Sequence, residues 1–452
     1  GNELVSWTKA GRQRSYVVCK GKLAERTARR AATGAAVGTR PFVVPVQIPE
    51  QLPSPSPAPL LEPLAVMGIG SWPRPAWMRR AVHERLEGRL AEKEFEATAD
   101  AAVRLAVEAQ LRAGVDAVTD GEQRRDSYAS FVGARLDNCQ LIPLTDLSAM
   151  VDEPDQFERE LRALDVPAAE VRHPVVYGPL GRSRPLAAHE AAFVRTLTPK
   201  PVKVALPGPY LLTRTMWLDC LRDRPYATRE ALATDVVRVL REELHDLLAA
   251  GVALVQFDEP VLTEVVFTGA KQQRSFMCGA LSEKRDPATE LGFAAELLNG
   301  VVRGSPAART ALHICRGNWT RDENAVLRGD YRALMDLLRN VEVGTLFLEL
   351  CTPRAGEMGL LRELPEDRRI GVGVVNQKLD RVETVDEIVD QAQRAIQLFG
   401  QSRVLLTPDC GFATFADNPV NSTPVAEAKL RALARARDRL RDGVSGRRGV
   451  NQ

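Results

Sequence analysis

The sequence predicts an α/β protein: a (β/α)8 TIM barrel with a small β-rich insertion after its second strand and a disordered basic extension at its N-terminus. From residue 64 onward, short apolar runs alternate with longer amphipathic stretches, and eight such runs can be distinguished. Most of them stay apolar until their last residues, as strands buried on both faces do. Eight strands with helices between them favour a parallel barrel over an open sheet.

The individual elements follow from these patterns. We expect the eight strands at Val66–Ser71, Ala117–Glu122, Val202–Pro207, Ala253–Asp258, Ala311–Cys315, Leu346–Cys351, Ile370–Val375 and Val404–Thr407. Helical periodicity is clear at Arg229–Ala250, Asp330–Asn340, Val385–Phe399 and Pro424–Leu440. The interval between the second and third strands is too long for one helix. We interpret Val171–Gly178 and its Gly- and Pro-rich neighbours as part of the β-rich insertion.

The start of the chain has a different composition. Residues 1–63 carry many basic and few acidic side chains and run into the proline-rich stretch Gln51–Pro59. This pattern is typical of a poorly ordered extension with a polyproline linker. An Arg-rich, acid-poor start is also typical of an organelle-targeting segment. We therefore predict two parts, an extension at 1–63 and a barrel at 64–445.

Composition limits the classes of function. Of 452 residues, 44% are hydrophobic and 27% charged, which is ordinary for a globular protein with a sizeable core. The formal net charge of +2 argues against nucleic acid or a membrane as the main partner. No apolar run is long enough to cross a bilayer. Seven cysteines are too sparse for a disulfide framework, which favours a cytoplasmic protein with reactive or metal-binding thiols.

Polar side chains gather where the predicted strands end, and barrel enzymes place their active sites there. His313 and Cys315 are two residues apart on one strand, so both point to the same face, here the barrel axis. Glu349 lies near the end of the following strand, and Cys410 comes just after the last one. Imidazole, thiolate and carboxylate are ligands of tetrahedral zinc. The four residues are therefore a candidate zinc site.

Each of these residues also has a structural interpretation. A single strand cysteine is usually a small buried hydrophobe, and a single histidine is usually a satisfied structural residue. Glu349 is harder to explain in this way, because a carboxylate inside an apolar strand is costly unless it is paired or ligated. Cys351 lies on the same strand face as Glu349 and competes for the ligand role, although we favour packing as its function.

Seven ordered motifs resemble the cobalamin-independent methionine synthases, in particular their C-terminal catalytic barrel. The motifs are Gly68–Pro73 (GIGSWP), Asp120–Glu122 (DGE), Leu206–Pro209 (LPGP), Gln256–Pro260 (QFDEP), His313–Cys315 (HIC), Leu348–Glu349 (LE) and Pro408–Gly411 (PDCG). They follow the family's order, and each falls at a predicted strand end. The chain is similar to the short, single-barrel members, which lack the second, N-terminal barrel of the long ones.

The resemblance implies a role for each motif residue. It implies four zinc ligands, which are His313, Cys315, Glu349 and Cys410. It places Glu122 and Asp258 against the amino group of homocysteine, and Ile69 and Ser71 against its carboxylate. Two carboxylates suit an ammonium group through charge-assisted hydrogen bonds. The structural alternative is a salt bridge from these acids to Arg124 or Arg125.

The activity implied by the resemblance is methyl transfer to homocysteine, giving methionine, with zinc as cofactor. A free thiol is mostly protonated at neutral pH, whereas the thiolate is the nucleophile. Binding of the substrate sulfur to zinc removes its proton and fixes its position. In-line attack on the donor's methyl group then forms the thioether. No catalytic side chain is expected beyond this zinc-activated substrate thiolate.

One departure from the long family members concerns the methyl donor. Those enzymes carry a histidine at the end of strand seven that assists the donor's leaving group. Here the corresponding stretch is Val374–Lys378, and it contains no histidine. Polyglutamyl methyltetrahydrofolate is therefore a doubtful donor, and a methyl-corrinoid or another small donor is the alternative.

Other functions remain open from the sequence. An epoxide:coenzyme M transferase-like enzyme would share the zinc site but would need cations for a sulfonate in place of Glu122 and Asp258. A uroporphyrinogen-decarboxylase-like enzyme on the same fold needs no metal. A zinc-bearing protein that binds a thiol without turnover is a third class. The two retained acids favour an amino-acid thiol over the coenzyme M alternative.

Overall fold

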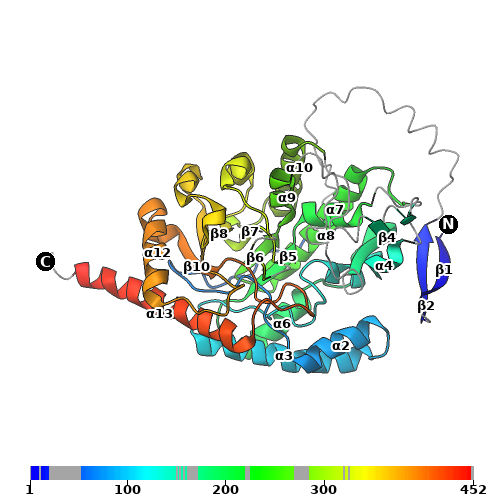
Figure 1. The fold of residues 1–452 in the computed structure, drawn as a ribbon, viewed down its shortest axis with the longest axis horizontal. Coiled ribbons are helices and arrows are strands. Elements are labelled where there is room, and N and C mark those ends of the chain that lie inside the picture. Colours follow the sequence, from blue (N-terminus) through cyan, green and yellow to red (C-terminus); the bar gives the residue numbers. More distant parts are fainter. Residues whose placement is uncertain are drawn as a thin grey trace.

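The computed structural model describes residues 2–9, 12–19, 52–148, 151, 154–155, 158–159, 172–218, 224–268, 285–318, 321–323 and 326–448. At its centre is a six-stranded parallel sheet with the order β10-β9-β8-β7-β6-β5 (Figure 1). The strands are β5 Lys203–Pro207, β6 Leu254–Asp258, β7 Thr310–Ile314, β8 Thr345–Glu349, β9 Arg369–Val375 and β10 Val404–Pro408. Each overlaps a predicted strand, so the α/β class with a parallel sheet is confirmed.

The first two predicted strands are shorter than expected. Val66 forms a single parallel bridge with Leu406 of β10, and Val118 forms one with Val202 next to β5. The backbone N–H of Asp116 donates to the carbonyl of Val66 at 2.8 Å. Hydrogen bonds thus connect both edges of the sheet through these two segments. Positive φ angles bound both segments, at Leu64 before the first and at Gly121 and Glu122 at the end of the second, and such a backbone does not continue a strand.

The two faces of the sheet differ in what covers them. Successive strand residues point to opposite faces. One set forms a compact apolar cluster that we call the inner face: Leu61, Ala65, Met67, Ile69, Ala117, Leu254, Ala311, Phe347 and Leu405. Alternating neighbours such as Val255, Leu312 and Leu346 belong instead to the larger core that the helices complete. The protein therefore buries its strands on both sides, as the apolar runs predicted.

Helices pack around the outer face (Figure 1). They are α3 Glu92–Ala113, α6 Ala188–Leu197, α7 Pro209–Met216, α8 Arg229–Ala249, α9 Val261–Phe267, α10 Pro287–Val302, α11 Met335–Asn340, α12 Val385–Phe399 and α13 Thr423–Arg448. Two helices lie apart from this face: α2 Ala76–Leu86 packs against α3 in a small core of its own, and the short α4 Leu144–Leu147 directly follows a strand that ends at Pro143. Local sequence sets where several begin. Thr384 and Glu387 form a capping box at α12, and Thr228 caps α8. The predicted helix at 330–340 starts instead with a 3-10 turn, Tyr331–Leu334.

A separate antiparallel ribbon lies, in chain order, between the Val118 bridge and β5. It pairs β3 Asp137–Pro143 with β4 Arg172–Gly181, with a register irregularity between Asp137 and Cys139. The second strand overlaps the stretch in which the sequence predicts β structure. The first strand was not predicted, because its apolar residues are few and do not alternate regularly.

Part of the N-terminal segment, which the sequence predicts to be disordered, forms a β-hairpin. β1 Asn2–Lys9 pairs antiparallel with β2 Arg12–Cys19, and residues 20–51 lie outside the described ranges. The proline-rich stretch contacts the sheet's helices. Ser56 N donates to Leu248 O at 3.1 Å, and the Ser56 carbonyl accepts from Arg309 Nη1 at 2.6 Å. A proline-rich chain has few N–H donors, but its carbonyls remain acceptors, and Arg309 uses one of them.

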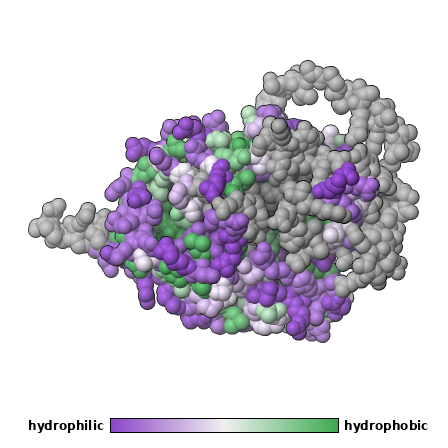
Figure 2. Space-filling model, viewed as in Figure 1, coloured by the Kyte–Doolittle hydropathy of each residue, from purple (hydrophilic) through white to green (hydrophobic). Residues whose placement is uncertain are grey.

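The described surface is mostly polar. Figure 2 shows hydrophilic residues over much of the visible face, with hydrophobic residues in small groups between them. Within the described ranges, no helix is both long and apolar enough to cross a membrane.

Candidate active site

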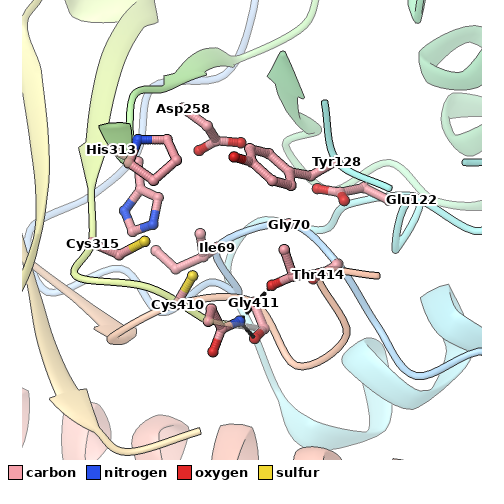
Figure 3. Close-up of a pocket in the computed structure, with 13 residues that line it drawn as sticks. Ile69, Gly70, Glu122, Tyr128, Asp258, His313, Cys315, Cys410, Gly411 and Thr414 are labelled. Carbon is pink, nitrogen blue, oxygen red and sulfur yellow. Dashed lines mark hydrogen bonds between the residues drawn. The ribbon is translucent and has the colours of Figure 1, made fainter. Parts of the chain in front are cut away.

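A pocket opens where the strands end, close to the inner face of the sheet (Figure 3). Its walls are Ile69, Gly70, Ser71, Glu122, Tyr128, Asp258, Pro260, His313, Cys315, Asn318, Cys410, Gly411 and Thr414. Seven of the eight site residues predicted from sequence are in this set, and Glu349 is not. Parallel strands bring their carboxyl ends to one edge, so residues far apart in sequence meet there.

Three potential metal donors meet in one wall of the pocket. His313 lies in β7, Cys315 comes directly after it, and Cys410 follows β10. One ligand atom from each residue lies within 4.8 Å of the others, and all three residues are buried (Figure 3). They form the one such group of three or more His, Cys, Asp or Glu found among the described residues. Nitrogen with two sulfurs is a donor set that zinc prefers.

The state of His313 supports a fit to a metal ion. Its side chain is buried, and its ring nitrogens have no hydrogen-bond partner among the described atoms other than the nearby thiol of Cys315. A buried imidazole with so few partners is costly, because its nitrogens lose their hydration with little compensation. A metal ion bound to one nitrogen would remove part of that cost. The residues present therefore fit a zinc ion.

A hydrogen bond joins the two thiols of this group. A hydrogen bond from Cys410, followed by the neighbouring His313, holds the pKa of Cys315 well below its ordinary value, although burial opposes this. The same hydrogen bond and burial raise the pKa of Cys410. Cys315 is thus the more acidic of the two thiols, and a positive ion between the sulfurs would favour the thiolate form of both.

Glu349 lies beside this group rather than within it. Its carboxylate Oε2 accepts from the backbone N–H of Arg316 at 2.8 Å, one residue beyond Cys315. Burial raises its pKa to about 8, and the charge of Asp409 adds to that rise. The competing thiol, Cys351, donates instead to Asp409 Oδ2 at 2.7 Å. That contact supports the packing interpretation of Cys351.

The two predicted acids face the same pocket from other strand ends. Burial raises the pKa of Glu122 to about 7 and that of Asp258 to about 6. Glu122 adopts a positive φ of 56°, and its N–H donates to Asp120 Oδ1 at 2.9 Å. Its Oε2 is buried and has no hydrogen-bond partner among the described atoms. Both acids are thus suited to receive a cationic group from a ligand.

The nearby arginines are mainly engaged elsewhere. Arg124 pairs with Glu96 at 2.9 Å. Arg125 pairs with Glu190 at 2.7 Å and comes no closer than 4.0 Å to Glu122. The salt bridge from Arg125 to Glu122, the alternative left open by the sequence, is therefore present only as a long contact at 4.0 Å, and Arg125 is bound more closely by Glu190.

Ile69 and Ser71 line the wall opposite the acids through the first strand segment. Ser71 Oγ accepts from Ala413 N at 3.2 Å. Two glycines keep this wall open. A Cβ at Gly70 would lie 2.2 Å from Glu122 Oε1, and a Cβ at Gly411 would lie 2.2 Å from Ser71 Oγ. A larger residue at either position would displace the Glu122 carboxylate or the Ser71 hydroxyl from its present place.

Three pocket residues lie outside the seven sequence motifs: Tyr128, Asn318 and Thr414. Asn318 Nδ2 donates to Thr414 Oγ1 at 2.5 Å and to the Gly411 carbonyl at 2.8 Å. Its Oδ1 accepts from Gln377 Nε2 at 2.7 Å. An amide network therefore reaches the pocket from the strand-seven end, where the sequence lacks a histidine. The polar run that follows Cys315 was the signal that could have identified Asn318.

Comparisons with known proteins agree with this arrangement. The family profile described as the catalytic domain of cobalamin-independent synthase matches residues 64–426. Among similar relatives, proteins named methionine synthase from Saccharolobus solfataricus and Sulfolobus acidocaldarius are each 24% identical over 344 residues. Those alignments cover 76% of this chain and 86% and 84% of the relatives.

Two solved structures show the same fold. A B12-independent methionine synthase from Shewanella sp. W3-18-1, in complex with selenomethionine, has a TM-score of 0.62 and 23% identity. A putative vitamin-B12 independent methionine synthase from Listeria monocytogenes has a TM-score of 0.59 and 18% identity. The matches cover 85% and 84% of this chain, and 99% of each of the other chains.

Proposed function

Because the chain belongs to the cobalamin-independent methionine synthase family, through the catalytic domain matched at residues 64–426, we propose that it transfers a methyl group to the sulfur of homocysteine at a zinc site. The observation that carries this proposal is the composition of one pocket. Three zinc-type donors occupy one wall, and two buried carboxylates face them. A thiol and an ammonium on the same small molecule would match those two features.

The proposed metal ligands are His313, Cys315 and Cys410, with Glu349 as the fourth. When bound, zinc supplies the charge that makes the substrate thiol a thiolate at neutral pH. Glu349 is proposed as the fourth ligand because its carboxylate lies beside the other three: it accepts a hydrogen bond from the backbone N–H of Arg316, the residue after Cys315. The donor set has the neutral imidazole and anionic thiolates that suit such a site.

The amino-acid part of the substrate would bind to the remaining walls. Glu122 and Asp258 would accept hydrogen bonds from the ammonium, and the gain in charge pairing would favour their ionised forms. Ile69 and Ser71 would face the carboxylate. The same two acids would repel a sulfonate, which opposes a coenzyme M-type substrate.

The fold is proposed in the form that the sequence predicts. The sheet with its two edge segments is a closed (β/α)8 barrel over residues 64–445, and the β3–β4 ribbon is an insertion after its second strand. Hydrogen bonds between the edge segments support this closure. Residues 1–63 form an extension outside the catalytic unit.

The methyl donor is proposed to be small or corrinoid-bound rather than polyglutamyl folate. At the strand-seven end, Asn376 Nδ2 donates to Glu323 and Gln377 donates to Asn318, so amides stand where long family members have a histidine. Amides donate hydrogen bonds but do not transfer protons readily near neutral pH.

The function is tested by a product screen. Zinc-loaded protein is incubated with homocysteine and, in separate reactions, with methyltetrahydrofolate, methylcobalamin and other methylated donors. We expect methionine with at least one donor other than the folate. Homocysteine binding without methionine from any donor would support a thiol-binding protein instead.

A further inference from the structure

A buried lysine lies beneath the pocket and has no role in the site described above. Lys203 opens β5 and is only 1% exposed. Its Nζ lies 4.5 Å from the centre of the Phe347 ring on β8, so the side chain projects onto the inner face. A buried ammonium is costly unless it is paired, which makes its contacts informative.

Two hydrogen bonds connect this lysine to the pocket. Lys203 Nζ donates to Gln256 Oε1 at 2.8 Å, and Gln256 Nε2 donates to Asp258 Oδ1 at 2.7 Å. Gln256 and Asp258 are two residues apart on β6, so they share the inner face. Neither Lys203 nor Gln256 lines the pocket, whereas Asp258 does.

The lysine decides which end of the Gln256 amide faces Asp258. The oxygen and nitrogen of an amide are nearly equal in shape, so an isolated glutamine could adopt either orientation. An ammonium has three donors and no acceptor, and therefore it can contact only the amide oxygen. The amide nitrogen is then directed to Asp258. A flipped amide would instead place an oxygen against the carboxylate and repel it.

The surroundings of Lys203 act on its charge in two directions. Burial is the larger effect and lowers its pKa to about 7, whereas the carboxylates of Asp258 and Glu122 favour the ammonium. The hydrogen bond to Gln256 Oε1 needs an N–H donor, which the lysine supplies in either form. An N–H donor on Asp258 in turn favours its ionised state and fixes the position of the side chain.

We propose that Lys203, acting through Gln256, is a positioning residue that holds Asp258 as a charged acceptor for the ammonium of the substrate thiol. The inference rests on the proposed function and adds a determinant of specificity. Lys203 and Gln256 would thus favour a thiol that carries an amino group, although neither residue lines the pocket or contacts the substrate.

The sharpest test is the Gln256→Glu variant. It keeps the size of the side chain and an acceptor for Lys203, but it replaces the donor facing Asp258 with an oxygen. Calorimetry on zinc-loaded protein measures the Kd of homocysteine and of 3-mercaptopropionate, which lacks the amino group. We expect the homocysteine Kd to rise by about tenfold or more, as for loss of a charge-assisted contact. The Kd of 3-mercaptopropionate and the zinc content should change little.

Two further variants separate this role from a general loss of structure. Gln393→Glu adds the same charge on an exposed face of α12 and should leave both Kd values unchanged. The double variant Lys203→Met/Gln256→Leu replaces the buried polar pair with apolar side chains of similar volume. It should show the same selective loss for homocysteine even if Gln256→Glu does not fold.

The outcomes distinguish the two proposals. If the unmodified protein binds homocysteine but the variants weaken both thiols equally, or neither, the role of Lys203 is overturned while the function stands. If the unmodified, zinc-loaded protein does not bind homocysteine, the proposed function is overturned and this inference with it.

Discussion

Burial determines the chemistry of the single residues in this pocket. The ring nitrogens of His313 have no hydrogen-bond partner among the described atoms other than the Cys315 thiol, and a hydrogen bond to Cys410 holds the pKa of Cys315 low while that of Cys410 is raised. Each of these states is costly for a purely structural residue, because buried polar groups are normally satisfied. A metal ion at this position would relieve both costs at once.

We expect the Cys410→Ser variant to lose most of its zinc while its fold is kept. The residue contributes one of three clustered donors at the edge of the sheet and little to the helix-covered core. Metal analysis and circular dichroism measure the two properties. Cys351→Ser is the matched control, since that thiol contacts Asp409, and it should retain zinc. Equal zinc loss in both variants would show that the ligand assignment is wrong.

Asp258→Asn should weaken homocysteine selectively. A charge-assisted hydrogen bond is worth roughly 1.5–3 kcal/mol, so the Kd should rise about tenfold to a hundredfold. 3-Mercaptopropionate should bind as before or better, because a nearby negative charge is removed. Asp390→Asn, on an exposed part of α12, controls for the change of charge. A similar loss for both thiols would assign Asp258 to structure.

Glu122→Gln should change how stability depends on pH. Burial raises the pKa of Glu122 from 4.5 to about 7, so between these values the native state keeps a proton that the unfolded chain has released. Raising the pH through this window therefore destabilises the native state. Glutamine does not titrate, so the variant is not destabilised in this way. The free energy of unfolding of the variant minus that of the unmodified, metal-free protein should therefore rise with pH up to about pH 7 and then level off. Parallel urea-unfolding profiles for the two proteins would contradict this.

The family resemblance implied the roles of Ile69, Ser71, Glu122 and Asp258, whereas strand periodicity predicts which side chains share a face. His313 and Cys315 illustrate this, since a spacing of two is sufficient to place both on the inner face. Tyr128 and Thr414 lie in loops, whose paths depend on tertiary contacts rather than on a periodic pattern. Glu349 was predicted to join the metal donors, but in the structure its carboxylate accepts from Arg316 N beside them.

At the scale of elements, the six later apolar runs gave reliable strands. β5 to β10 lie where they were predicted, and α12 spans the predicted range. The first two strands are reduced to bridges at Val66 and Val118, because a run of apolar residues does not report the positive φ angles at Leu64, Gly121 and Glu122 that interrupt the extended backbone. The proline-rich stretch was expected to be a linker without contacts, but Arg309 donates a hydrogen bond to its Ser56 carbonyl. Composition alone does not reveal such a contact with a distant residue.

Truncation tests the contact made by that stretch. Removing residues 1–60 should lower the free energy of unfolding by more than removing residues 1–51 does. The longer deletion loses contacts of Pro53 with His245 and of Ser56 with Leu248 and Arg309. At about 1 kcal/mol for each hydrogen bond, the loss should be roughly 1–3 kcal/mol. Identical urea midpoints for the two truncated proteins would contradict the docking of this segment.

At the scale of the whole molecule, the parallel sheet explains why the site is where it is. Every strand delivers its last residues to one edge, and the first segment closes the same pocket with Ile69 and Ser71. The helices stabilise the outer face, so the inner face and its carboxyl edge are free to carry polar and metal-binding groups. Lys203 and Gln256 extend this polar region below the pocket.

The central claim is that the three donors hold a zinc ion to which the substrate sulfur binds. X-ray absorption at the zinc edge, measured with and without saturating homocysteine, tests it most directly. We expect zinc with two sulfur neighbours, from Cys315 and Cys410, in the free protein and one additional sulfur neighbour in the complex. An unchanged number of sulfur neighbours at saturation, or no bound zinc after reconstitution under reducing conditions, would contradict the account.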